Sequence, residues 1–424
     1  MVSFHPFRPR GTVRAPASKS YAQRAIACSV ISNHDVLIEE YDACDDSEYA
    51  LKAAHKLGCT IEYVETSSRN LRVGHRSYAE ASPKGRPIIL NFGGSATSFR
   101  IFTGISCVTP GVKLLRGTAQ LMRRPMKELI QALNSQGARI TSKDGSPPLT
   151  VYPTGLMGGT TMLSGRVSSQ YTSSLMIAGT RANSPVEIVH SQVPASAGYI
   201  RITAHVLGAF GAKIEHESDC RRVVVNPTPL SATRFKLEGD YSSASYILAM
   251  GAIRGEIKVT NLPRVTYQPD AHFLEILKVA NASLKIDTNS VTVWESDLEG
   301  FEADLEENPD LCPLLAVLGA YAKGQTVLTG LDRLKYKETD RVVTTLELLK
   351  SLGVSCSYDG SAIRITGGSV LGGIVNSYGD HRIALAAAAA SVGSCGRIEV
   401  TGFGCHTKSY PDFLRHYRAL EGSV

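Results

Sequence analysis

The sequence contains an internal repeat, and this repeat constrains the fold more than any other feature. An apolar helical stretch is followed by a glycine, a small residue and an extended segment, at intervals of 70 to 79 residues. The glycines are Gly58, Gly137, Gly211 and Gly353, and Asn281 takes the equivalent place in one copy. Glycine, and asparagine after it, tolerates the left-handed backbone conformation that ends many helices. Each position is therefore predicted to mark the end of a helix that leads into a strand.

A second series of helices alternates with the first. These helices are rich in Ala, Ser, Gly, Leu and Ile on all sides, which is typical of helices buried in a core. They are predicted to start near Ser20, Thr97, Ser169, Ser243, Pro313 and Arg382. The two series agree on six units of about 71 residues, and a helix around 411–420 completes the sixth. The sequence therefore predicts an α/β fold of six βαβαββ repeats.

The composition excludes several classes of protein. The longest apolar runs, at 314–322 and 383–392, are too short to span a bilayer. Residues 1–14 lack the apolar core of a signal peptide, and we expect them to form the first strand. Nine cysteines without a CxxC spacing favour reduced thiols in a cytoplasmic protein. The net charge of +6 comes without long basic runs, which favours a small anionic ligand over nucleic acid.

The starts of the buried helices contain many ionic and hydroxyl side chains. The free N–H groups and partial positive charge of a helix N-terminus attract anions. Ser, Thr and Asp at these positions are often only caps, and we expect this of Asp240 and Ser242. Lys19 and Arg24 differ, because cations in the first turns oppose the helix dipole unless an anion binds. The triplet 380–382, Asp-His-Arg, opens an otherwise uncharged helix and likewise favours a binding site.

Loops of equivalent units add further cations. The run 335–341 is charged, a pattern that most often marks a solvated face. Arg124 precedes Pro125 at the matching place of another unit, and Lys408 precedes Pro411 in the last unit. Because the cations recur at matching places, we interpret them as parts of one site for polyanions.

Several of these motifs occur together, and in the same order, in one family of transferases. The motifs are Ser18-Lys19-Ser20 with Arg24, Arg124-Pro125, Ser168-Ser169-Gln170, Lys337-Glu338-Thr339-Asp340-Arg341, Asp380-His381-Arg382 and Lys408-Ser409-Tyr410-Pro411. From about Arg14 to Leu420 the chain resembles the 5-enolpyruvylshikimate-3-phosphate (EPSP) synthase family. That family transfers the carboxyvinyl group of phosphoenolpyruvate to the 5-hydroxyl of shikimate 3-phosphate, through a tetrahedral intermediate, in the shikimate pathway of aromatic amino-acid biosynthesis.

The resemblance implies a specific architecture. It is the two-domain, inside-out α/β barrel-like fold of the enolpyruvyl transferases, with three repeats around a pseudo-threefold axis in each domain. One domain is expected at 19–237, and the other combines 1–18 with 238–424. Two crossover strands join them, and the active site is expected in the cleft between them, which closes on the substrates.

The resemblance also implies a role for each matching residue. The residues expected to bind shikimate 3-phosphate are Lys19, Ser20, Arg24, Thr97, Ser168, Ser169, Gln170, Ser196, Tyr199, Asp310 and Lys337. Those expected around phosphoenolpyruvate are Lys19, Ala96, Arg124, Gln170, Arg341, Arg382 and Lys408. The proton transfers are expected to be shared among Lys19, Asp310 and Glu338. No metal or cofactor is expected, and the protein is expected to be a cytoplasmic monomer and a target of glyphosate.

The chain departs from the family pattern at several positions. Ala96 replaces a glycine, and we expect its methyl group to leave room for phosphoenolpyruvate but to crowd the longer inhibitor glyphosate. The other departures are Gly94 for an asparagine, Ala197-Gly198 for a basic residue and proline, Pro269 for a glycine in a Gln-Gly-Asp phrase, and Arg333 for an asparagine. They leave the contacts around Ser196 and Arg333 open.

Two rival functions remain at this point. One is the sister enzyme that transfers the same group to UDP-N-acetylglucosamine, which differs from this chain at Ser20 and in the region 120–122. The other is a non-catalytic phosphate or nucleic-acid binder of a related repeat fold. Such a binder would not need the carboxylates Asp310 and Glu338 beside its cations, and its affinity would fall steeply with salt.

Overall fold

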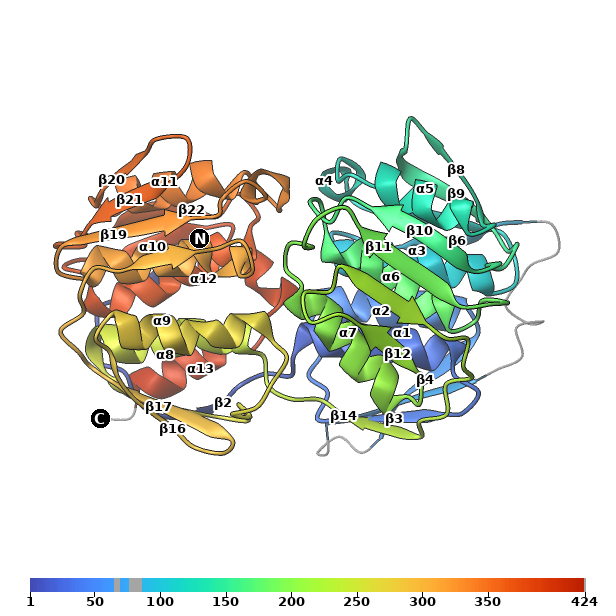
Figure 1. The fold of residues 1–424 in the computed structure, drawn as a ribbon. Helices are drawn as coiled ribbons and strands as arrows, with labels where there is room; N and C mark the ends of the chain where they lie inside the picture. The colour runs from blue at the N-terminus through green and yellow to red at the C-terminus, as the bar shows by residue number, and fades with distance from the viewer. Residues whose placement is uncertain (65–68, 76–85, 423–424) are drawn as a thin grey trace. The chain divides into compact units, whose positions relative to one another are not determined.

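The computed structural model describes residues 1–64, 69–75 and 86–422. Contacts within the chain divide it into two compact units. One unit is Ala17–Leu237, and the other combines Met1–Pro16 with Glu238–Val424. Each unit contains three of the sheets found among the described residues (Figure 1).

The unit Ala17–Leu237 alternates helices with short strands. Its helices are α1 (Lys19–Ile31), α2 (Asp45–Lys56), α3 (Ala96–Val108), α4 (Ala119–Met122), α5 (Lys127–Ser135), α6 (Ser169–Gly179) and α7 (Gly198–Ala209). Its strands are β3 (Val36–Glu39), β4 (Cys59–Val64), β5 (Asn70–His75), β6 (Ile88–Asn91), β7 (Lys113–Arg116), β8 (Arg139–Lys143), β9 (Ser146–Tyr152), β10 (Gly159–Leu163), β11 (Val186–His190), β12 (Ile214–His216), β13 (Arg222–Val225) and β14 (Arg234–Lys236). They form sheets in the orders β14-β3-β5-β4, β6-β7-β9-β8 and β10-β11-β13-β12.

The other unit repeats the same pattern. Its α-helices are α8 (Tyr241–Arg254), α9 (Phe273–Val279), α10 (Cys312–Tyr321), α11 (Arg341–Ser351), α12 (His381–Ala390) and α13 (Phe413–Glu421). Short 3-10 helices are η2 (Pro269–His272), η3 (Pro309–Leu311), η4 (Leu334–Tyr336), η5 (Ser391–Gly393) and η6 (Phe403–Lys408). Its strands are β1 (Val2–Phe4), β2 (Arg10–Arg14), β15 (Glu256–Thr260), β16 (Ser283–Ile286), β17 (Ser290–Trp294), β18 (Glu302–Asp304), β19 (Gln325–Thr329), β20 (Ser355–Tyr358), β21 (Ile363–Thr366), β22 (Gly373–Asn376) and β23 (Ile398–Thr401). They form sheets in the orders β16-β17-β15-β2, β18-β19-β21-β20 and β1-β23-β22.

The sheet topology confirms the predicted repeat. In the segment 88–152, β6 and β7 are parallel neighbours with α3 between them in sequence, and β8 and β9 form an antiparallel hairpin after α5. The other four-stranded sheets have the same order of one parallel pair followed by two antiparallel pairs. Two sheets take their first strand from a distant part of the chain, because β14 pairs with β3 and β2 pairs with β15.

The prediction of a single N-terminal strand was wrong. The segment forms β1 and β2, which belong to different sheets: β1 is antiparallel to β23, whereas β2 is parallel to β15. Pro6 and Pro9 lie between the two strands. Because proline has no N–H group for the ladder, these two residues interrupt what would otherwise be one extended segment.

The predicted helix ends are confirmed by the backbone. The φ angle is +96° at Gly58, +90° at Gly137, +90° at Gly211 and +75° at Gly353. It is +62° at Asn281, so the asparagine adopts the same left-handed conformation as the glycines. The sequence marker and the conformation that explains it therefore agree in all five copies.

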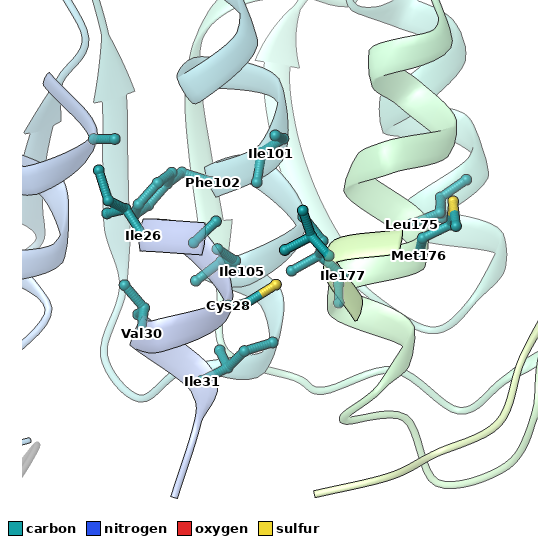
Figure 2. Close-up of a cluster of buried hydrophobic side chains, with 14 of the residues drawn as sticks. Ile26, Cys28, Val30, Ile31, Ile101, Phe102, Ile105, Leu175, Met176 and Ile177 are labelled. Atoms are coloured by element: carbon teal, nitrogen blue, oxygen red, sulfur yellow. The ribbon is translucent and has the colours of Figure 1, made fainter. Parts of the chain in front are cut away.

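The core of each unit is built from the second series of helices. In the unit Ala17–Leu237, α1, α3 and α6 bury apolar side chains against one another (Figure 2). Examples that are at most 1% exposed are Ile26, Val30, Ile105, Leu175 and Ile177. Small residues on these helices allow close packing. In the other unit, α8, α10 and α12 form the corresponding core. Among the described residues, no helix combines the length and apolar character needed to cross a membrane.

Candidate active site

The start of α1 bears a lysine that is paired with a buried carboxylate. Lys19 is the first residue of α1, and its Nζ lies 3.1 Å from Oδ2 of Asp46 in the first turn of α2. The side chains are 14% and 6% exposed. This partner explains how α1 tolerates a cation at its positive end, because the Asp46 carboxylate offsets the unfavourable dipole.

Arg24, one turn further along α1, lies in a different environment. It is 1% exposed, and its Nε donates to Oγ1 of Thr203 at 2.7 Å. Its Nη2 donates to Oγ of Ser173 at 3.1 Å and to the carbonyl of Tyr199 at 3.2 Å. These acceptors are neutral, and burial lowers the pKa of Arg24 to about 10. A buried cation whose hydrogen bonds end on neutral oxygens has a strong electrostatic preference for an anion.

The starts of α3 and α6 are joined by hydrogen bonds. Nε2 of Gln170 donates to Oγ1 of Thr97 at 2.8 Å. Nη1 of Arg100 donates to Oε1 of Gln170 at 2.8 Å and to Oγ of Ser168 at 3.1 Å. Its guanidinium also lies over the ring of Tyr171, 5.1 Å from the centroid. Arg100 therefore orients two residues that the sequence predicts as ligands of shikimate 3-phosphate.

The sequence places Arg100 among the ionic residues at the buried helix starts, but it is not among the residues assigned to a substrate. It is a cation one turn into a buried helix, which is the same mismatch that pointed to Arg24. The remaining predicted residues of this unit lie near the same helix starts or in neighbouring loops. They are Ser20 in α1, Ser169 in α6, Ser196 and Tyr199 at the start of α7, and Arg124 between α4 and α5.

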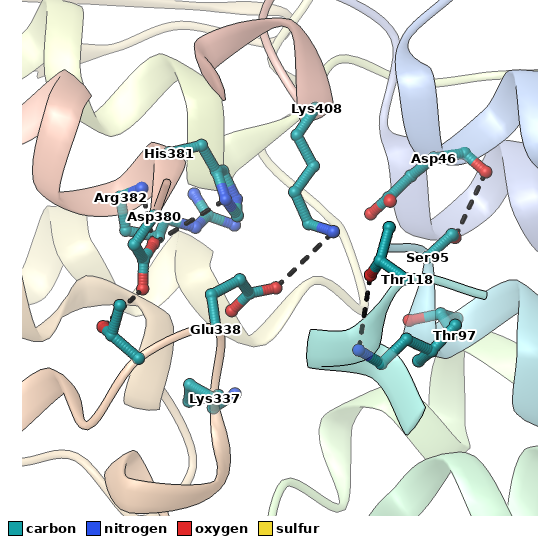
Figure 3. A network of polar contacts seen from close by, with 12 residues as sticks. Asp46, Ser95, Thr97, Thr118, Lys337, Glu338, Asp380, His381, Arg382 and Lys408 are labelled. Carbon is teal, nitrogen blue, oxygen red and sulfur yellow. Dashed lines mark hydrogen bonds and ion pairs between the residues drawn. The ribbon is translucent and has the colours of Figure 1, made fainter. Parts of the chain in front are cut away.

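The turn before α3 is fixed by a buried glutamine that sequence reasoning missed. Gln23 is 1% exposed, and its Nε2 donates to Oγ of Ser95 at 2.9 Å and of Ser98 at 2.7 Å. The Ser95 hydroxyl, at the N-cap position of α3, bonds to the Asp46 carbonyl at 3.3 Å and does not cap the helix (Figure 3). This cluster fixes the turn that precedes Ala96, the first residue of α3.

In the other unit, one guanidinium lies among three carboxylates. Arg341 is 1% exposed, and its Nη1 lies 2.6 Å from Oδ1 of Asp310. Its Nη2 lies 2.7 Å from Oε2 of Glu338, and its Nε lies 2.8 Å from Oδ2 of Asp380. These three ion pairs raise the pKa of Arg341 against the opposing effect of burial. Arg341 is therefore a fixed positive centre to which all three acids are attached.

Asp310 has two further cationic partners. Nζ of Lys337 lies 2.9 Å from its Oδ1, and Nη2 of Arg382 lies 3.3 Å from its Oδ2. Burial alone would raise the pKa of Asp310, but Lys337, Arg341 and Arg382 hold it well below the usual range. Asp310 is therefore ionised at neutral pH.

Glu338 is also contacted from two sides. Besides Arg341, its neighbour is Lys408, whose Nζ lies 3.7 Å from Oε1 (Figure 3). The Glu338 and Lys408 side chains are 11% and 13% exposed. The run 335–341 is therefore only in part a solvated face: Glu338 and Arg341 are directed into a buried cluster, whereas Lys335, Tyr336 and Asp340 are exposed.

The capping predictions have a mixed outcome. Asp240 caps α8, because its Oδ1 accepts from the Ser243 N–H at 2.7 Å. Asp380 likewise accepts from the Arg382 N–H at 2.9 Å while pairing with Arg341. The prediction for Ser242 was wrong, because its hydroxyl donates to the carboxylate of Asp270. A cap at this helix start is already supplied by Asp240, so the next hydroxyl is available for another partner.

The departures from the family pattern can also be located. Arg333 donates from Nη2 to the Glu306 carbonyl, and its charge contributes to lowering the pKa of Lys337 after the larger effect of burial. Pro269 is the first residue of η2, where a missing N–H group is harmless. Ala197 and Gly198 lie where α7 begins, and Ser196 before them has a φ of +56°.

Comparisons with known proteins agree with one another. A model of the family described as EPSP synthase (3-phosphoshikimate 1-carboxyvinyltransferase) matches residues 6–417. The 3-phosphoshikimate 1-carboxyvinyltransferase of Aeropyrum pernix is 36% identical, and the match covers 100% of this chain and 96% of that protein. The protein of the same name from Dehalococcoides mccartyi is 32% identical, with 98% and 97% covered. The solved EPSP synthase of Acinetobacter baumannii has the same fold, with a TM-score of 0.83 at 23% identity and coverage of 99% and 98%.

Proposed function

Because this chain belongs to the EPSP synthase family, we propose that it transfers the carboxyvinyl group of phosphoenolpyruvate to the 5-hydroxyl of shikimate 3-phosphate and releases phosphate. The observation that supports this reaction best is the cluster around Arg341. Carboxylates lie there beside cations that can bind phosphate and carboxylate groups. A pure anion binder needs the cations but gains nothing from the acids.

The helix starts of the unit Ala17–Leu237 suit shikimate 3-phosphate. Arg24 is a buried cation with neutral partners, and the Thr97–Gln170 pair adds hydrogen-bonding groups nearby. A phosphate or carboxylate beside Arg24 would receive charge-assisted hydrogen bonds. We assign Lys19, Ser20, Ser168, Ser169, Ser196 and Tyr199 to the same substrate on the basis of the family motifs.

Phosphoenolpyruvate carries a phosphate and a carboxylate, which match guanidinium groups well. Lys408 and the arginines 341 and 382 are the cations that one unit offers, and Lys19 and Arg124 are those that the other offers. Ala96 and Gln170 complete the proposed surroundings. Asp310 and Lys337, which belong to the same unit as Arg341, Arg382 and Lys408, are proposed to contact shikimate 3-phosphate.

The reaction requires two changes in bonding. First, the 5-hydroxyl oxygen bonds to C2 of phosphoenolpyruvate, its proton passes to a base, and the methylene carbon C3 gains a proton. Then C3 loses a proton while the bond between C2 and the phosphate oxygen breaks, and phosphate leaves. We propose that Lys19, Asp310 and Glu338 share these transfers, each of which typically contributes about 100- to 10,000-fold to the rate. The surrounding cations stabilise the charge that develops.

The proposed substrate-binding residues come from both units. The proposed reaction therefore requires residues of both units to contact the same substrates. We propose that the substrates join them and that the domains close around the complex, which excludes water. The enzyme is proposed to act as a cytoplasmic monomer on two small molecules, without metal, cofactor or nucleic acid. The full-length match to relatives that share one enzyme name disfavours the UDP-N-acetylglucosamine enzyme.

A phosphate-release assay tests the proposed function. The purified chain should release phosphate only when shikimate 3-phosphate and phosphoenolpyruvate are both present. Replacing the acceptor with UDP-N-acetylglucosamine should abolish release, and release with that acceptor would identify the sister activity. If both acceptors bind but neither supports release, the chain is a binder and the proposal fails.

A further inference from the structure

The segment Gln268-Pro269-Asp270 lies against the start of α8 and has no role in the function proposed above. Oε1 of Gln268 accepts from the Tyr241 N–H at 3.0 Å, and its Nε2 donates to the Gly239 carbonyl at 2.7 Å. Pro269 then begins η2, which directs Asp270 into the interior. Gln268 therefore fixes the backbone on both sides of Asp240, the N-cap residue of α8.

Asp270 is a buried acid whose two oxygens have different partners. It is 1% exposed. Its Oδ2 accepts from the Ser242 hydroxyl, and its Oδ1 accepts from Nδ2 of Asn308 at 3.3 Å. Burial and the charge of Asp310 raise the pKa of Asp270, whereas Arg382, Ser242 and Asn308 lower it. An acid in this position is electrostatically coupled to both members of the Asp310–Arg382 pair.

The contacts of Asp270 close a ring behind that pair. Asn308 lies two residues before Asp310, at the start of η3. On the other side, the Ser242 carbonyl accepts from Nη1 of Arg382 at 3.4 Å. Nη2 of Arg382 reaches Oδ2 of Asp310 at 3.3 Å and completes the ring. Asp270 connects the two arms of this ring. One arm runs through Asn308 to Asp310, and the other runs through Ser242 to Arg382.

We propose that Asp270 is a positioning residue that fixes the relative geometry of Asp310 and Arg382 for the transfer reaction. This inference rests on the proposed function. Asp270 is buried and its carboxylate oxygens are engaged by Ser242 and Asn308, so it acts through its neighbours and not by touching substrate. One arm sets the backbone that presents Asp310, and the other sets the carbonyl that orients Arg382. Such supporting contacts matter because small displacements of reacting groups have large effects on rate.

The test is a double-mutant cycle on the full chain with Asp270→Asn, Arg382→Lys and both changes together. Asparagine keeps the size of the side chain, but its amide presents a donor where one of the two bonds requires an acceptor. Thermal unfolding should stay close to wild type, whereas kcat/KM for phosphoenolpyruvate should fall roughly 10-fold, as expected for contacting residues in one network. In the Arg382→Lys background the same change should have little further effect. Asp297→Asn is the matched control, because this exposed acid forms an ion pair with the exposed Lys323 and lies outside the ring.

Each outcome decides the inference. Equal effects of Asp270→Asn in the wild-type and Arg382→Lys backgrounds would show a general structural role, and wild-type kinetics for Asp270→Asn would show none; either overturns the proposal. If Asp270→Asn does not fold, Ser242→Ala and Asn308→Ala break the two arms separately. Both should then lower kcat/KM, and wild-type values for both would again overturn it. A wild-type chain without phosphate release would instead refute the proposed function, so the two failures are distinguishable.

Discussion

Nη2 of Arg341 lies 2.7 Å from Oε2 of Glu338, the residue three positions before it. The pair joins the loop before α11 to the first residue of that helix, and Arg341 simultaneously contacts Asp310 and Asp380. A guanidinium that is occupied by three acids is held in place before any substrate arrives. Arg341, in turn, fixes the positions of Glu338 and Asp310, the carboxylates proposed to transfer protons. Against the effect of burial, Lys337, Arg341 and Arg382 together keep Asp310 ionised.

Replacing Glu338 should therefore slow the reaction more than it weakens binding. For Glu338→Gln we expect kcat to fall about 100-fold or more, because the proposed proton-transfer group is lost while the size of the side chain is kept. The KM for phosphoenolpyruvate should change only a few-fold. Glu347→Gln, an exposed change within α11, is the control. A large rise in KM with an unchanged kcat would contradict the role in proton transfer.

Arg24 and Arg341 are both 1% exposed, yet their removal should affect folding in opposite ways. Arg341→Met leaves three acids without their shared cation and should cost about 3 to 5 kcal/mol in the free energy of unfolding. Arg24→Met removes a desolvated cation whose acceptors are neutral, so stability without substrate should be unchanged or higher.

Urea denaturation of both variants without substrates measures this difference. The KM for shikimate 3-phosphate should rise at least about 10-fold in Arg24→Met, because the proposed phosphate contact is lost. Similar destabilisation by both changes would refute the distinction between a cation that is already paired with three acids and a cation whose hydrogen-bond acceptors are neutral.

The methyl group of Ala96 should reduce inhibition by glyphosate. Ala96 is the first residue of α3 and is 8% exposed. A glycine there would open space next to the turn that Gln23 and Ser95 fix, so Ala96→Gly should bind glyphosate more tightly with a similar KM for phosphoenolpyruvate. Inhibition constants of both forms provide the measurement. Equal constants would eliminate Ala96 as the cause of any resistance.

The fold was largely predictable because the residues that mark the repeat have a clear conformational preference. Gly58 and Asn281 mark helix ends through their backbone conformation, and no knowledge of packing is needed to read them. The pairing of β1 and β2 with distant strands was not predictable, because those partners lie more than 200 residues away.

The site was predictable only in part, and the misses share a cause. Charged residues at helix starts are conspicuous in the sequence, so Lys19, Arg24 and Arg382 could be proposed as site residues from the sequence alone. Gln23 and Asp270 act through contacts with residues from other helices, and an amide or acid in a sequence does not reveal which neighbour it meets. Ser242 was misread for the same reason, because a hydroxyl at a helix start is compatible with a cap and with a contact to another element.

Lys113 should make stability depend on pH. Its Nζ is buried and donates to the carbonyls of Ser106 and Thr109 at the end of α3, and burial lowers its pKa to about 7 from an ordinary value of 10.5. Between these values the unfolded chain binds a proton that the folded chain does not, so stability should rise with pH from about 7 to 10. In Lys113→Met this contribution should vanish. Thermal unfolding of both forms at pH 7 and pH 9.5 measures it, and parallel pH dependences would contradict the prediction.

Asn281 offers a test of the repeat itself. With a φ of +62° it adopts the conformation of the glycines at the other helix ends, and its Nδ2 also donates to the Asp297 carbonyl at 3.1 Å. Asn281→Ala should cost about 1 kcal/mol or more, because alanine disfavours the left-handed region and loses this bond. Asn281→Gly should cost less, because glycine adopts the conformation without strain. Urea denaturation of the two variants measures the difference. If alanine were tolerated as well as glycine, backbone conformation would not be what selects the residue at this position of the repeat.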